Sequence, residues 1–272
     1  MRLFFSGLRK LVRRLATWVT FGLLAGLLAL IVVAVAATTH RAGATANERL
    51  AELSLLTFPG AYDLILSFIL GLGGLFAVIY GAAIAGSEWS WGTLKNAVAR
   101  GGSRSGYMLF TFASIAVMIA LGLLLTFAVG VVAAFVGAHI AGVSTSGLGD
   151  AATLGRLPRL FVRGWLAILE ESALGFAIAT LARSQLGGIG AGIALYFGEA
   201  FAGIFLPDFV KYLPFSVAQA SVATGAASGG GFAGGGAVAA LPANSALVLV
   251  GVWLVAALVV TALFTERAEI SG

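Results

Sequence analysis

The chain has 272 residues, of which 60% are hydrophobic and 10% charged, and its mean hydropathy is +1.04. An average soluble domain carries about 25% charged residues, so this composition excludes an ordinary soluble domain. The net charge is +5, and the lack of cysteine excludes disulfides, thiolate metal sites and cysteine nucleophiles. Apolar runs near the ~20 residues that cross a bilayer recur along the sequence, which predicts one all-α integral membrane domain over residues 1–272.

The first sixteen residues, MRLFFSGLRKLVRRLA, predict an amphipathic helix, because at 100° per residue the apolar and basic side chains fall on opposite arcs. We expect it to lie in the plane of the interface, with its bases against anionic lipid headgroups. A cleaved signal peptide is the alternative, but the following apolar run is about twenty residues rather than the usual 7–15. The apolar arc holds Phe4, Phe5, Leu8, Leu11, Val12 and Leu15, and the basic arc holds Arg2, Arg9, Lys10, Arg13 and Arg14.

Six apolar runs predict six transmembrane helices. The third run is longer than one straight span needs, which predicts tilt or an extension beyond the bilayer. Gly22 with Gly26 in the first run and Gly188 with Gly192 in the fifth have a spacing that suits close helix packing, within the chain or at a dimer seam. The predicted spans are 17–37, 61–86, 107–138, 158–182, 186–206 and 244–264.

Charge distribution favours cytoplasmic N- and C-termini. With this orientation ten of the sixteen Lys and Arg residues lie on inside segments, and eight of the eleven acids lie outside or within spans. We therefore predict a multi-pass protein of the cell inner (plasma) membrane, whose bases meet membrane lipids and not nucleic acid. The inside bases are Arg2, Arg9, Lys10, Arg13, Arg14, Lys95, Arg100, Arg104, Arg183 and Arg267, and the outside bases are Arg41, Arg49, Arg156, Arg159, Arg163 and Lys211.

The predicted outer segment 207–243 is rich in glycine, and no charged residue occurs from Tyr212 to Thr265. A solvated linker normally carries polar or charged residues. We predict that part of this segment dips into the outer leaflet or packs on the spans, with a flexible glycine loop as the alternative.

Catalytic and nucleotide-binding motifs are missing from the sequence. The two histidines, His40 and His139, form no metal-binding pattern. The stretch GGSRSGY at 101–107 has glycines but lacks the Lys-Ser/Thr of a phosphate loop. We expect no enzyme activity, no bound metal and no directly bound cofactor in this chain.

Three acids lie in predicted spans. Glu170 and Glu171 stand about a third of the way in from the outer end of the fourth span, and Glu199 lies in the fifth. An ionised carboxylate at depth costs several kcal/mol unless it is paired or hydrated. These acids are therefore candidates for lining or gating a translocation path, while pairing with Arg163 on nearly the same helix face is the structural alternative.

The stretch SEWSWGTLKNAVARGGSR, residues 87–104, lies on the predicted cytoplasmic side between spans two and three. Gly86, Gly101 and Gly102 bracket a segment that suits a short helix, with Trp89 and Trp91 near the headgroups. Exposed aromatics beside charges suit a docking surface for another protein. An interfacial loop held by its tryptophans is the alternative.

This loop resembles that of a known family. Glu88, followed by Gly-Thr-Leu-Lys at 92–95 and by Arg104, is similar to the cytoplasmic loop of ABC-2 type transporter permeases. In that family the loop, here 87–105, carries the coupling helix that inserts into a cleft on the ATP-hydrolysing subunit. The elbow helix at 1–16, the six spans and the outer segment 207–243 extend the resemblance, which implies the ABC-2 (type V exporter) fold.

The resemblance implies a half-transporter. Two permease chains, identical or paralogous, would work with two cytoplasmic ATPase subunits that bind ATP and Mg, and the family usually exports its substrates. Those substrates include lipids, polysaccharide precursors, peptides and drugs. The residues expected to couple the chain to its ATPase are Glu88, Trp89, Trp91, Gly92, Thr93, Leu94, Lys95 and Arg104.

Two other functions remain open from the sequence. One is an ion- or proton-coupled secondary carrier that uses Glu170, Glu171 and Glu199 as titrating groups. The other is a membrane scaffold or an immunity-type sequestering protein that moves no substrate.

Overall fold

The computed structural model describes residues 2–39, 45–99, 103–222 and 241–268, which form helices and their connections with no strand among them. Six helices are long and apolar enough to cross a membrane, which confirms the six predicted spans. They are α2 (Leu15–Thr38), α4 (Gly60–Ser90), α6 (Arg104–Ile140), α7 (Ala151–Ala182), α8 (Gln185–Phe205) and α11 (Ala243–Arg267).

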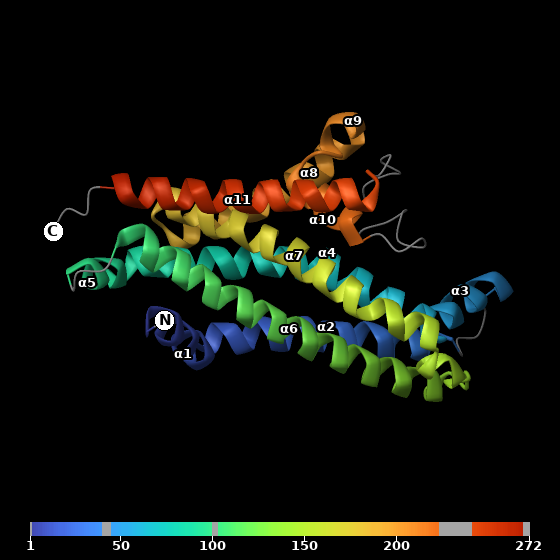
Figure 1. The fold of residues 1–272 in the computed structure, drawn as a ribbon. Helices are drawn as coiled ribbons and strands as arrows, with labels where there is room; N and C mark the ends of the chain where they lie inside the picture. Colours follow the sequence, from blue (N-terminus) through green and yellow to red (C-terminus); the bar gives the residue numbers. More distant parts are fainter. Residues whose placement is uncertain (1, 40–44, 100–102, 223–240, 269–272) are drawn as a thin grey trace.

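The six long helices run side by side (Figure 1). Helices α4 and α7 lie in the middle and are the most buried, with α2 and α6 on one side and α8 and α11 on the other. One end of the bundle, called the α1 end below, carries α1 (Arg2–Arg13), α5 (Thr93–Ala99) and the last turn of α11. The opposite end, called the α3 end, carries α3 (Ala46–Leu56), η1 (Ser146–Gly149) and α9 (Pro207–Val210).

Glycines let α4 and α7 approach until their backbones touch. A Cβ atom built at Gly81 would meet the carbonyl oxygen of Ser172, and one built at Gly175 would meet that of Val78. Because only glycine lacks this atom, the two residues allow a close crossing of α4 and α7 in the bundle core. Close approach of this kind is the usual way to pack helices in membranes.

The two predicted glycine pairs have different surroundings. Gly188 and Gly192 are buried and face Ala179 on α7 and Val78 on α4, so this pair packs α8 inside the chain. Gly22 and Gly26 have no described atom within 4 Å of a built Cβ, and they lie on the exposed face of α2.

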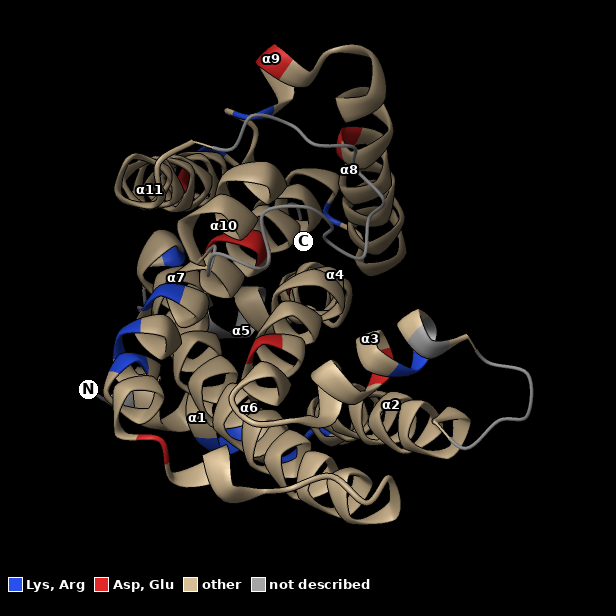
Figure 2. Cartoon of the chain, turned by 90° about the vertical axis from the view of Figure 1, so that its right-hand side faces the viewer, with Lys and Arg blue, Asp and Glu red and all other residues tan. Residues whose placement is uncertain are grey.

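Helix α7 begins at Ala151 rather than at 158, the predicted start of the fourth span. Asp150 caps this end, because its carboxylate accepts a hydrogen bond from the Thr153 backbone N at 2.9 Å. The Thr153 hydroxyl also donates to it, and these bonds lower the pKa of the Asp150 carboxyl. From this cap the helix continues through Pro158. Its first turns place basic residues at the α3 end (Figure 2).

The structure contains helices that the sequence did not predict. Helix α3 lies in the connection 38–60, for which no element was expected. Within the outer segment 207–243, α10 (Pro214–Val222) buries Phe215, Val217 and Ala218 against α7 and α11. This part of the segment packs on the spans, whereas its glycine run falls in 223–240, outside the described residues.

Helix α6 is 37 residues long, about 55 Å at 1.5 Å per residue, and exceeds the ~30 Å hydrocarbon core. This agrees with the predicted tilt or extension of the third span.

Helix α1 has the predicted amphipathic pattern, and Arg14, with extended backbone (φ −78°, ψ 125°), separates it from α2. Leu11 is buried while Arg9 and Arg13 are exposed. The basic arc is divided, however, because Lys10 and Arg14 point into the bundle and not toward a polar surface.

The crossing of α4 and α7 predicts opposite effects for one substitution at two places in α7. Gly175→Ala adds a methyl group against the Val78 carbonyl and should destabilise the chain by about 1–3 kcal/mol. Gly155→Ala, at an exposed position with open space, should stabilise it by about 0.5–1 kcal/mol through helix propensity. Thermal unfolding of the detergent-purified chain, followed by size-exclusion chromatography, measures both. Equal melting temperatures for the two variants would contradict the close approach.

Candidate functional site

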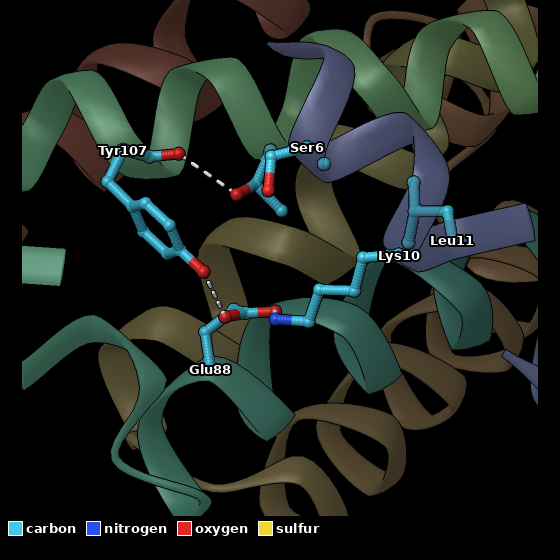
Figure 3. Close-up of a pocket in the computed structure, with 7 residues that line it drawn as sticks. Ser6, Lys10, Leu11, Glu88 and Tyr107 are labelled. Atoms are coloured by element: carbon cyan, nitrogen blue, oxygen red, sulfur yellow. Dashed lines mark hydrogen bonds and ion pairs between the residues drawn. The ribbon is translucent and has the colours of Figure 1, made fainter. Parts of the chain in front are cut away.

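The carboxylate of Glu88, in the last turn of α4, is fully buried at the α1 end. Lys10 Nζ lies 2.5 Å from its Oε1, and Arg14 Nη2 lies 3.4 Å from the same oxygen. Thr93 Oγ1 donates to Oε2 at 2.5 Å, and the Tyr107 hydroxyl donates to it at 2.7 Å. Figure 3 shows Lys10 and Tyr107 meeting this carboxylate from opposite sides. These five residues are called the Glu88 cluster below.

The Glu88 cluster satisfies a charge that is expensive to bury. Removing a carboxylate from water costs several kcal/mol, and only close opposite charges and hydrogen bonds offset that cost. The cluster supplies two bases and two hydroxyls, and Arg14 Nη1 also donates to Ser87 Oγ at 2.8 Å. It thereby joins α1, α4, α5 and α6 at one point.

A small cavity of about 40 Å³ adjoins the cluster, between α1 and α6. This volume is enough for a water molecule, and the wall offers polar groups that can bond it. The lining residues are Ser6, Gly7, Lys10, Leu11, Glu88, Tyr107 and Thr111.

Trp89 joins α4 to the other side of the bundle. Its ring centroid lies 6.3 Å from that of Phe264 on α11, in an edge-on arrangement. The guanidinium of Arg183 lies 5.5 Å from the Trp89 ring and 5.3 Å from the Phe264 ring, within the range of cation–π attraction. Arg183 has a left-handed backbone (φ 47°) and ends α7. Glu88 and Trp89, adjacent in sequence, therefore contact different halves of the bundle.

The turn from α4 into α5 depends on Gly92, whose φ of +65° favours glycine. Beside it Trp91 is 65% exposed, with the Arg14 guanidinium 5.0 Å from its ring. Leu94 is buried and holds α5 against the bundle, while the side chain of Lys95 lies outside the described residues. The predicted single helix is thus divided: α4 continues to Ser90, and α5 covers only Thr93–Ala99.

Arg104 connects the start of α6 to the end of α11. Its Nη1 donates to the carbonyl oxygen of Ala268 at 2.7 Å, and the hydroxyl of Ser105 donates to Glu266 Oε1 at 2.5 Å. Arg104 follows the end of α5 by only five residues, but its side chain bonds the end of α11.

The predicted coupling residues fall into two groups. Glu88 and Leu94 are buried, Trp89 is half-buried and Thr93 bonds Glu88, so these residues hold the segment from α4 into α5. Arg104 instead bonds the end of α11. Among those with described side chains, Trp91 has the largest exposed fraction. The sequence interpretation missed the residues that hold this segment in place, which are Lys10, Arg14, Tyr107, Arg183 and Phe264.

Glu170 and Glu171 of α7 are 0% and 1% exposed, and none of their four carboxyl oxygens has a hydrogen-bond partner among the described residues. Glu171 lies directly against Gly74 of α4. Arg163, the alternative partner, instead donates to the Ser221 carbonyl oxygen at 3.3 Å and to Asn244 Oδ1 at 2.6 Å. The pairing alternative from the sequence is therefore wrong.

The structure gives the position of the two acids along α7. Because α7 begins at Ala151, Glu170 lies nearer its α1 end, about 18 Å along the axis from Ala182. The acids therefore stand past the midpoint of α7, and their depth in a membrane stays a prediction.

Glu199 of α8 has a defined structural contact. Its Oε1 accepts from the Ser216 backbone N at 2.6 Å and its Oε2 from the Phe215 backbone N at 3.2 Å. These groups belong to the first turn of α10, whose free N–H groups favour a carboxylate. The neighbouring Tyr196 hydroxyl donates to the Gly71 carbonyl oxygen at 2.8 Å. Glu199 therefore differs from the α7 acids, with which it was grouped from the sequence.

Comparison with known proteins identifies no relative: no family model matches the chain, and no curated protein matches it. Within the described residues there is also no group of three or more His, Cys, Asp or Glu side chains that could hold a metal ion. Of the two histidines, His139 is described and His40 lies outside the described residues.

The contacts of the Glu88 cluster predict a graded loss of stability. Glu88→Ala leaves Lys10 and Arg14 without their carboxylate and should cost about 1–3 kcal/mol. Tyr107→Phe removes one hydrogen bond and should cost less. Asp208→Asn, at an exposed acid of the α3 end, is the control and should have little effect. Thermal unfolding of the purified variants gives the order, and a Glu88→Ala variant as stable as the control would show that the cluster contributes no stability.

Proposed function

We propose that the chain is the membrane-spanning permease subunit of an ABC transporter of the ABC-2 type, driven by separate ATPase subunits. The observation that carries this proposal is the placement of α5 at the α1 end, joined to α1, α4 and α6 by the buried carboxylate of Glu88. A short surface helix held so firmly to the long helices suits the transmission of movement from a docked protein. The six span-length helices and the amphipathic α1 support the same function.

In this proposal, different residues of the segment have different roles in coupling. Trp91 and the outward side of α5 would contact the ATPase, because exposed aromatic side chains favour protein interfaces. Glu88 would pass displacement of α5 to α1 and α6 through Thr93, Lys10 and Tyr107. Trp89 and Arg183 would carry it to the turn between α7 and α8. This assigns Glu88 a positioning role rather than a direct contact with the ATPase.

The proposed assembly contains a second permease chain, identical or paralogous, and two ATPase subunits that bind ATP and Mg. The α1 end would face the cytoplasm of a cell whose inner membrane the chain spans, since ten of its sixteen bases then lie inside. The exported substrate would be of the lipid, peptide, drug or polysaccharide type. Glu170 and Glu171 are the proposed gate or lining of its path.

A secondary carrier is the second candidate function, and the unpartnered acids of α7 favour it specifically. Such a carrier would move its substrate in liposomes under an ion or pH gradient without any ATPase. The permease should do so only with its ATPase and ATP.

Purification of the tagged chain from its native membranes in mild detergent tests the proposal. We expect a stoichiometric partner that carries a phosphate-binding loop and hydrolyses ATP. Trp91→Ala should weaken its retention about tenfold or more, since buried tryptophans dominate many interfaces. Trp18→Ala is the matched control, because Trp18 is also exposed but belongs to α2. A wild-type chain that purifies alone, while other transporter complexes survive the same extraction, would overturn the permease function.

Coupling needs a separate measurement of ATP-driven transport. Gly92→Pro cannot adopt the φ of +65° and should misplace α5, and Glu88→Ala should disconnect it. Both variants should lose most transport even if some ATPase stays bound. Transport at the wild-type rate in both would remove the coupling role of this segment.

A further inference from the structure

The two acids of α7 without hydrogen-bond partners lie in a part of the bundle core where the described helices supply no free basic side chain. Glu170 and Glu171 are buried in α7, which packs against α4, α6, α8, α10 and α11. In α6 the single Lys or Arg is its first residue, Arg104. Helices α4, α8 and α10 contain no Lys or Arg at all, and the single base of α11 is its last residue, Arg267. No small movement of these helices would therefore bring a basic side chain to the pair.

The nearest base on α7 itself is already used. Arg163 stands seven residues before Glu170 on nearly the same face, but its guanidinium bonds Ser221 and Asn244. Glu199, the other acid nearby, is satisfied by the backbone of α10. The two α7 carboxyls thus differ from every other described acid of the bundle core, since both Glu88 and Glu199 have partners.

The part of α4 opposite Glu171 is rich in glycine. Three of the four residues at 71–74 of α4 are glycine, with Leu72 among them, and the carboxyl of Glu171 fills the space at Gly74. Tyr196 stands beside this stretch with its hydroxyl on the Gly71 carbonyl oxygen. Separation of α4 from α7 would expose the carboxyls of α7 opposite the glycine-rich face of α4, with the ring of Tyr196 on α8 beside them. Acidic groups next to glycines and an aromatic ring suit a hydrophobic cation.

We propose that Glu170 and Glu171 bind the positively charged group of a hydrophobic organic cation, carried as substrate. This assigns a substrate class to the proposed transporter, and it rests on that function only for the movement of the cation, not for its binding. A buried carboxyl pair without an internal partner gains its counter-charge from the ligand.

Binding of tetraphenylphosphonium to the purified full-length chain in detergent tests this inference by equilibrium dialysis. Tetraphenylborate, with the same shape and the opposite charge, is the probe control. We expect saturable binding of the phosphonium near one per chain and none of the borate. Equal binding of both ions, or no saturable binding of the phosphonium, would overturn the proposal without any variant.

Substitutions then assign the residues. Glu170→Gln and Glu171→Gln keep the side-chain size and remove the charge, so each should weaken phosphonium binding about tenfold or more. Glu171→Asp, which keeps the charge, should weaken it less, and Asp208→Asn at the exposed surface should leave it unchanged. Wild-type affinity in the doubly neutral variant would also overturn the inference. Retention of the ATPase is measured in parallel. Phosphonium binding by a chain that retains no ATPase would contradict only the permease function. An ATPase partner without phosphonium binding would contradict only the cation site.

Discussion

A single buried carboxylate holds together the end of the molecule where function is proposed. Glu88 gathers two bases and two hydroxyls from elements that are distant in sequence, and without it these groups would have no common partner. Because a buried charge is tolerated only in such surroundings, the position of α5 relative to the long helices is strongly determined. Trp89 extends the same arrangement to α11 and to the turn before α8. The surface that remains for a partner, around Trp91, is therefore presented on a firmly held support.

The buried acids of the core can be distinguished by their partners. Glu88 is satisfied by side chains, and Glu199 is satisfied by backbone N–H groups of α10. Both have contacts that explain them structurally. Glu170 and Glu171 have no such contact in the described residues, although they lie beside the close crossing of α4 and α7. A buried carboxyl without a hydrogen-bond partner is a stronger candidate for the proposed transport role than one that has partners. From the sequence alone, all three span acids were equal candidates.

The sequence predicted the six long helices because sustained hydropathy is a local property. It placed the start of the fourth span at 158 from the apolar run, whereas α7 begins at Ala151, where Asp150 caps it. It also missed α3, which has no strong periodic signal. The Glu88 cluster was beyond local patterns, because Lys10 and Glu88 are 78 positions apart. Opposite charges in otherwise apolar segments were the available signal, but they do not specify which base meets which acid.

The length of α6 has a mechanical consequence. One unbroken helix runs from Tyr107, which touches the Glu88 cluster, to Ala138, packed in the core near the opposite end. No proline interrupts it, and sharp helix kinks occur mostly at proline. A rigid tilt of α6 about the helices packed on its middle would therefore displace its two ends in opposite directions. A displacement of α5 at the α1 end would then also move the α3 end of α6. The orientation of this one helix would thus link the positions of the two ends of the bundle.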